Sequence, residues 1–131
     1  MIVLDEQLLG RHLEREIGKW YRGTVCFITD LRPNTVIKDE DIPKLLRHQD
    51  QPTFVTINER DFWRKVAITE QFCIICFCLP DPRASEISSI LRTLFRHPEF
   101  RTKRRRMGKV IRVSHQRISY YSFSDMRTQT C

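Results

Sequence analysis

The feature that most constrains the fold is an uninterrupted apolar run from Phe72 to Leu79. It has the length of a β-strand and is apolar on both faces, so it predicts a strand at the centre of a sheet rather than at its edge. Pro80 and Pro82 follow the run and end it. Strands buried on both faces are typical of parallel sheets that are covered by helices.

Strand-like and helix-like segments alternate along the chain. Predicted strands cover residues 2–4, 24–29, 53–57, 72–79, 110–113 and 118–121, the last two about a short turn. Predicted helices cover residues 7–20, 39–51, 61–67 and 85–97. This order predicts an α/β fold with a parallel sheet and helices on both of its faces.

The length of 131 residues suits one domain, which we place at residues 1–123, followed by a polar tail at residues 124–131 that we expect to be frayed and flexible. No apolar run reaches the roughly 18 residues that span a bilayer. Asp5 and Glu6 disfavour a signal peptide. Five cysteines, an odd number, fit a reducing compartment. We therefore expect a cytoplasmic protein with no membrane segment.

Three of the cysteines raise the alternative of a zinc site. Cys73 and Cys76 have the spacing of a ligand pair. They lie inside the apolar run, however, and no second pair stands at a suitable distance along the chain. Free cysteine is also among the most buried residue types, so we interpret Cys73, Cys76 and Cys78 as core residues.

Positive charge is concentrated late in the chain. The net charge is +7, and nine Lys or Arg lie between Arg96 and Arg117, with Glu99 as the only acid among them. Such a segment attracts a polyanion by displacing its counterions, which predicts salt-dependent binding of nucleic acid. A solvated basic face that keeps the protein soluble is the alternative.

Acidic residues follow two of the predicted strands. Asp5 stands directly after residues 2–4, Asp61 shortly after residues 53–57, and the group Asp39 to Asp41 opens a helix between them. If the strands are parallel, these acids meet at the carboxyl edge of one sheet, where ligands bind in open α/β folds. Converging carboxylates hold hard divalent cations, and a bound cation can activate water against a phosphodiester.

Local structural roles are the alternative for each of these acids. Asp39 and Asp61 can cap the helices that follow them, and Asp5 can cap the first helix. Spacing alone is therefore a weak signal for a metal site.

Three segments resemble the PIN-domain ribonucleases, in particular the PIN-like group with Asp-Glu after the first strand that is related to VapC-type toxins. They are Ile2-Val3-Leu4-Asp5-Glu6, Asp39-Glu40-Asp41-Ile42 and Phe54-Val55-Thr56-Ile57-Asn58-Glu59-Arg60-Asp61-Phe62. The most specific piece is Thr-x-Asn-x-x-Asp-Phe, present as Thr56, Asn58, Asp61 and Phe62. The resemblance covers about residues 1–120. It implies a three-layer α/β/α sandwich with a central parallel sheet of about five strands, and cleavage of RNA that depends on Mg²⁺ or Mn²⁺.

The resemblance also implies roles for individual residues. Asp5 matches the first metal-binding acid, Asp39 or Glu40 the second, and Asp61 the third. These four residues are the expected catalytic group.

Neighbouring residues complete the expected site. Thr56 and Asn58 match residues that orient the acids by hydrogen bonds, and Glu6 stands beside the first of them. PIN domains commonly have a fourth acid. Asp81, just past the fourth strand, is the best match by position, and Asp30 is the other choice.

We expect a toxin of a toxin–antitoxin pair that cleaves RNA, with a basic segment guiding the RNA to the acids. The predicted RNA-binding residues are Arg101, Lys103, Arg104, Arg105, Arg106 and Lys109. RNA is the expected partner; a cognate antitoxin protein and a second copy of the chain, forming a homodimer, are further candidates. The alternative function is a PIN-like module that has lost catalysis and binds RNA or protein.

Overall fold

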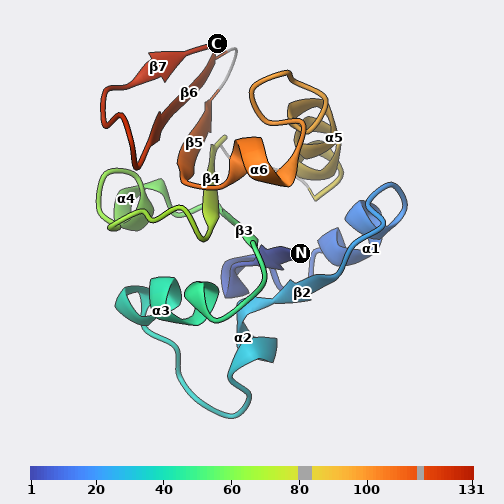
Figure 1. Ribbon diagram of the computed structural model, residues 1–131. Helices are drawn as coiled ribbons and strands as arrows, with labels where there is room; N and C mark the ends of the chain where they lie inside the picture. The colour runs from blue at the N-terminus through green and yellow to red at the C-terminus, as the bar shows by residue number, and fades with distance from the viewer. Residues whose placement is uncertain (80–83, 115–116) are drawn as a thin grey trace.

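The computed structural model describes residues 1–79, 84–114 and 117–131. The strands within these ranges are β1 (Ile2–Leu4), β2 (Val25–Phe27), β3 (Thr53–Thr56), β4 (Cys73–Cys78), β5 (Lys109–Ser114), β6 (Arg117–Ser122) and β7 (Gln129–Thr130). The helices are α1 (Leu13–Gly18), α2 (Ile28–Leu31), α3 (Ile42–Arg47), α4 (Glu59–Phe62), α5 (Ala84–Leu94) and α6 (Lys103–Arg106), with short 3-10 helices η1 (Glu6–Leu8) and η2 (Asp39–Asp41). Figure 1 shows their arrangement.

The strands of the described residues form one sheet of seven in the order β2-β1-β3-β4-β5-β6-β7. The first five are parallel to one another, and β6 and β7 are antiparallel to their neighbours. The mixed α/β class is confirmed, as is the central position of β4 between β3 and β5. Because the chain leaves β1 toward β2 and later returns to its other side as β3, the order reverses between β1 and β3. Ligand sites in open α/β sheets lie at such a reversal.

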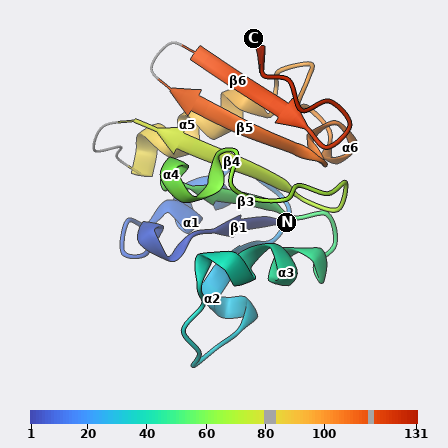
Figure 2. The same cartoon turned by 90° about the vertical axis from the view of Figure 1, so that its left-hand side faces the viewer.

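Alternate residues of each parallel strand point into two separate buried clusters, one on each face of the sheet. In β4, Ile75 packs with α1 and α5 on one face, and Ile74 packs with α2, α3 and α4 on the other. Figure 2 shows α3 and α4 in front of the strands, with α5 behind them. Burial on both faces is what the uninterrupted apolar run predicted. Cys73 and Cys76 are fully buried core residues, as expected.

The predicted helix at residues 7–20 is confirmed only over Leu13–Gly18, and its first half is wrong. The chain forms η1, turns, and starts α1 at Leu13. Gly10 and His12 have φ angles of 78° and 57°, in the left-handed region that an α-helix excludes. Leu9, which a continuous helix would place on the same side as the buried residues Leu13 and Ile17, is 52% exposed.

Other boundaries also differ from the sequence-based expectation. β2 ends at Phe27, and the next residues form α2 instead of extending the strand. The basic connection after Arg101 contains helix α6. The tail contains β7, which adds a strand beside β6 through residues Gln129 and Thr130. In the described residues no helix combines the length and the apolar character needed to cross a membrane.

Candidate active site

Asp5 and Thr56 lie side by side where β1 and β3 end. The backbone N–H of Asp5 donates to the carbonyl oxygen of Val55 at 2.9 Å, which continues the pairing of the two strands beyond Leu4. Asp5 is 3% exposed and Thr56 is fully buried. The Thr56 hydroxyl donates to Oδ2 of Asp5 at 2.6 Å. The first predicted acid is therefore fixed in place by the strand next to it.

Asn58 connects this buried pair to two exposed acids. Its backbone N–H donates to Oγ1 of Thr56 at 2.9 Å. Its side-chain amide donates to Oδ2 of Asp61 at 2.6 Å and to Oδ2 of Asp39 at 3.5 Å, the outer limit of a hydrogen bond. Asp5, Thr56, Asn58, Asp61 and Asp39 thus form one hydrogen-bonded group, which we call the acidic site.

Asp61 occupies the first turn of α4, and its position has a local cause as well. The side chain of Asn58 caps this helix by accepting from the backbone N–H of Asp61 at 3.3 Å. The helix cap is therefore Asn58, and the carboxylate of Asp61 points to Asn58 and Asp39 instead of capping a helix. Asp39 is the first residue of η2, whose cap residue is Lys38, and its carboxylate accepts from the side chain of Asn58.

The acids of the site disturb one another's ionisation. Burial raises the pKa of Asp39 to about 6, together with its hydrogen bond to Asp61 and the charges of Asp5, Asp61 and Glu6. The hydrogen bonds from Asn58 and Asp39 lower the pKa of Asp61. The opposite directions are those expected of two neighbouring carboxyl groups whose ionisations are linked. Burial also raises the pKa of Asp5, against the hydrogen bond from Thr56.

The remaining predicted acids are placed less centrally. Glu6 is exposed and acts on the site through its charge. Glu40 is exposed and lines a hollow together with Asp39 and Asp61. Asp81 lies outside the described residues. Asp30 accepts from the backbone N–H of Phe27 at 2.9 Å and so serves the start of α2.

The chemistry of the acidic site fits a hard divalent cation. Its donors are carboxylate oxygens, and burial raises the pKa of Asp39 together with the neighbouring acids, whose repulsion a bound cation would offset. Among the residues that the structure describes, no three His, Cys, Asp or Glu side chains are already arranged as ligands around one point. Asp5, Asp39 and Asp61 would hold the cation, with Glu40 beside them.

The basic segment lies away from this site. Helix α6 leads into the amino end of β5, whereas the acids lie at the carboxyl ends of β1 and β3. Because the strands are parallel, the two groups occupy opposite edges of the sheet, as Figure 2 shows. The side of the sheet at which the parallel strands begin is called the amino edge below. Its exposed cations are Arg101, Lys103, Arg104 and Arg105.

Two of the predicted RNA-binding residues have structural roles. Arg106 is 5% exposed, and its guanidinium donates to the carbonyl oxygen of Phe100 at 2.9 Å and lies 4.0 Å from the ring centre of Phe95. Lys109 is half-buried, and its ammonium donates to the backbone oxygen of Glu99 at 2.9 Å. These contacts stabilise the connection into β5.

The cations nearest the acidic site were not singled out by the sequence. Lys44 and Lys65 line a hollow of about 490 Å³ together with Asp39 and Asp61. The charges of Arg60 and Lys65 also lower the pKa of Asp61. The sequence does contain a signal for these two lysines. Lys44 stands four residues after Glu40 and Lys65 four residues after Asp61, a spacing that places two side chains on the same face of a helix.

Comparison with known proteins assigns neither a family nor a function to this chain. No model of a known family, no curated protein and no solved structure matches the chain. The function proposed below is therefore supported by the acidic site itself and by the resemblance of its motifs.

Proposed function

We propose that this protein is a divalent-metal-dependent ribonuclease with a PIN-like three-layer α/β/α fold. One observation carries the proposal. The hydrogen bonds through Thr56 and Asn58 link three carboxylates, those of Asp5, Asp39 and Asp61, at the point where the strand order reverses. Helix capping accounts for the contact of Asn58 with Asp61 but not for the bonds to Asp5 and Asp39, whereas a cation site at the usual ligand position of an α/β sheet accounts for all of them.

Each residue has a distinct role in this proposal. Asp5, Asp39 and Asp61 hold the cation, and Glu40 stands close enough to assist. Thr56 orients Asp5, and Asn58 holds Asp39 and Asp61 toward each other. A bound Mg²⁺ or Mn²⁺ supplies a Lewis acid and an activated water for hydrolysis of the phosphodiester.

The cations beside the acids suit a nucleic-acid substrate. Lys44 and Lys65 are exposed on the wall of the hollow that Asp39 and Asp61 also line. Their ammonium groups can neutralise phosphates on either side of the scissile bond. A toxin of a toxin–antitoxin pair remains the biological setting that we propose, from the resemblance to VapC-type toxins.

The direct test is cleavage of single-stranded RNA in the presence of Mn²⁺ or Mg²⁺ by the wild type and by Asp61→Asn. Asp61 is exposed, so the substitution preserves the fold. Asp41→Asn is the matched control, because Asp41 is a neighbouring acid of the group Asp39 to Asp41 but does not belong to the hydrogen-bonded site. We expect loss of cleavage by Asp61→Asn and normal cleavage by Asp41→Asn. Equal rates for all three proteins would refute the assignment.

The second candidate is a PIN-like module that binds RNA without cleaving it. The specific observation in its favour is the separation of the exposed cations of α6 from the acidic site, since binding at the amino edge needs no acids. Calorimetric titration with Mn²⁺ distinguishes the two. Salt-dependent binding of RNA together with an absence of Mn²⁺ binding would favour the module.

A further inference from the structure

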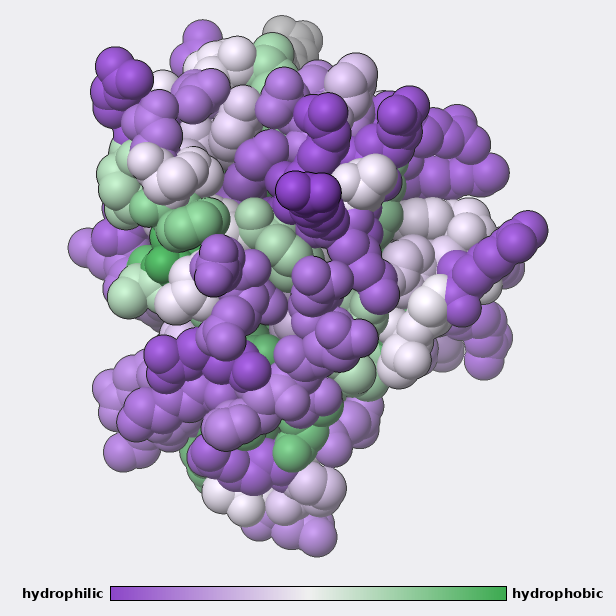
Figure 3. Space-filling model, in the orientation of Figure 1, coloured by the Kyte–Doolittle hydropathy of each residue, from purple (hydrophilic) through white to green (hydrophobic). Residues whose placement is uncertain are grey.

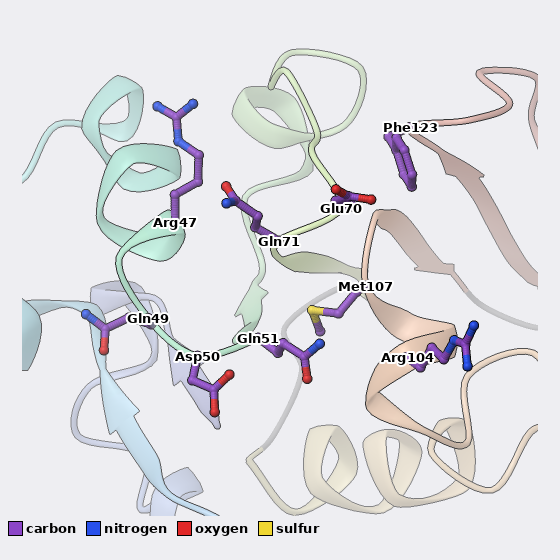
Figure 4. A pocket seen from close by; sticks show the side chains of 9 residues that line it. All are labelled: Arg47, Gln49, Asp50, Gln51, Glu70, Gln71, Arg104, Met107 and Phe123. Carbon is purple, nitrogen blue, oxygen red and sulfur yellow. The ribbon is translucent and has the colours of Figure 1, made fainter.

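Two hollows on one face of the molecule share a wall residue. The first, described above, contains Asp39 and Asp61 at its acidic end. The second has a volume of about 480 Å³ and lies at the amino edge of the sheet, between the residues that precede β3, β4 and β5 (Figure 4). Arg47 lines both. The hollows are therefore neighbours, each of a size that holds a small ligand.

Helix α3 explains how the two hollows are joined. It runs antiparallel to the strands, from η2 at the acidic site to the loop that enters β3 at Thr53. Lys44 and Arg47 are one helical turn apart on it, and both are exposed. On the opposite wall, the segment after α4 runs from Lys65 to Gln71 and leads into β4. The two hollows adjoin at Arg47, and we call them together the groove; its cations are Lys44, Lys65, Arg47 and Arg104.

The second hollow has the components of a nucleobase site. The ring of Phe123 is 47% exposed at its border, where a base can stack on it. Gln51 and Gln71 offer amide donors and acceptors to a base edge. Arg104 stands at the far end, on α6. Figure 4 shows these side chains around the buried Met107 at the centre of the hollow.

The carboxylates of Asp50 and Glu70 also line this hollow, so it is not a simple anion site. A lone phosphate would meet both signs of charge there. A nucleotide matches the mixture better, because carboxylates accept hydrogen bonds from the amino groups of bases while arginines bind the phosphates.

We propose that the groove from the acidic site past Arg47 to Phe123 binds a single RNA strand, with one base stacked on Phe123. The inference rests on the proposed function in taking RNA as the occupant. The central strand β4 has six residues, about 20 Å at roughly 3.3 Å each, which matches about six nucleotides stacked at roughly 3.4 Å. The exposed cations of α6 then contact RNA beyond the base site, so the basic segment serves the acidic site from a distance.

A protein partner fits this face less well. The side chains that line the two hollows are mostly polar or charged, and the side of the molecule drawn in Figure 3 is also mostly hydrophilic. Protein interfaces have an apolar core, which this surface does not offer. Single-stranded RNA needs only one aromatic platform and a line of cations.

The experiment measures binding of fluorescently labelled RNA oligonucleotides of about four to ten residues by anisotropy, in EDTA so that cleavage does not interfere. Arg47→Gln removes the shared cation. Phe123→Leu removes the stacking ring but keeps an apolar side chain against Gly108, whose backbone oxygen accepts from the N–H of Phe123. Arg92→Gln is the matched control, because Arg92 is exposed on α5, on the opposite face.

We expect Arg47→Gln and Phe123→Leu each to weaken binding about tenfold. Arg47→Gln should also reduce the slope of log affinity against log salt concentration by about 0.7, the value for one phosphate contact on a single strand. The affinity of the wild type should rise with RNA length to about six nucleotides and then level off. Arg92→Gln should change neither affinity nor slope.

If Arg47→Gln and Arg92→Gln bind RNA with equal affinities and equal slopes of log affinity against log salt concentration, the proposal that RNA binds along the groove is refuted. Unchanged binding by Phe123→Leu would also refute it. The result is separable from the proposed function. If the variants bind as expected but the wild type does not cleave RNA, the nuclease fails and the groove stands. If Asp61→Asn abolishes cleavage while Arg47→Gln binds normally, the groove fails and the nuclease stands.

Discussion

The ionised form of Asp39 destabilises the folded protein, because folding raises the pKa of this carboxyl group. Burial and the neighbouring acids raise its pKa to about 6 from an ordinary 3.8. The folded protein therefore holds this proton more tightly than the unfolded chain does. Stability is fully present below the ordinary pKa and is lost as the pH rises through the raised one. Between about pH 4 and pH 7, deprotonation of Asp39 should destabilise the fold.

Asp39→Asn should remove this loss. An asparagine amide can donate to the Asp61 carboxylate, as the protonated acid does, but it does not ionise. We expect the variant to be more stable than the wild type by about 1 kcal/mol above pH 7, after allowing for solvent screening of this exposed side chain. The difference should vanish below about pH 4. Urea unfolding in EDTA at several pH values measures it, and a difference that does not change with pH would contradict the pKa argument.

Thr56 supports the site at the same scale. Its hydroxyl donates to Asp5 and accepts from the backbone N–H of Asn58, and it is fully buried. Thr56→Val keeps the shape and removes both bonds, so we expect a loss of about 2 kcal/mol of unfolding free energy. Thr56→Ser keeps the hydroxyl and should lose about 1 kcal/mol or less. Equal losses in denaturant unfolding would mean that the hydroxyl does not support the site.

The four cations of helix α6 differ in exposure, because three lie in solvent and one is buried. Lys103, Arg104 and Arg105 are exposed, whereas the guanidinium of Arg106 is buried against Phe95 and bonded to the carbonyl oxygen of Phe100. The sequence shows four equivalent basic residues in a row. Which of them faces the core depends on the helix and on the ring it packs against, and neither is encoded in the charge pattern.

Arg106→Gln should therefore destabilise the fold by about 2 kcal/mol, because it leaves a buried carbonyl without its donor and removes the contact with Phe95. Arg105→Gln should change stability by less than about 0.5 kcal/mol. Thermal unfolding of the two variants, each compared with the wild type, is the measurement. Similar melting temperatures for both would show that Arg106 does not stabilise this connection.

The elements that the sequence predicts well are those with buried apolar runs. β4 is found within one residue of the predicted run at each end, because burial on both faces leaves no other structure for it. The first half of the helix predicted at residues 7–20 does not form, for a local reason. Its apolar spacing is helical, but the left-handed residues Gly10 and His12 interrupt it. β7 has no pattern of its own and is held by its pairing with β6.

The strand order determines where the acids and the basic segment lie relative to each other in the sheet. The sequence correctly brings Asp5, Thr56, Asn58 and Asp61 together, because each follows a parallel strand or ends one. It does not show that residues before β5 lie at the opposite edge, which depends on how β5 joins the sheet. The groove past Arg47 is the connection between the two edges in our account.

Cleavage of RNA at the acidic site should depend on a cation and on each of the three carboxylates. Single-turnover cleavage of RNA in Mn²⁺ by the wild type and by Asp39→Asn tests it most directly, with unfolding measured on the same samples. We predict that Asp39→Asn is more stable than the wild type in EDTA. We also predict that it cleaves RNA at least about a hundredfold more slowly, because it lacks the negative charge of one of the carboxylates that we propose to bind the metal. Cleavage by Asp39→Asn at the wild-type rate would show that the Asp39 carboxylate takes no part in the reaction.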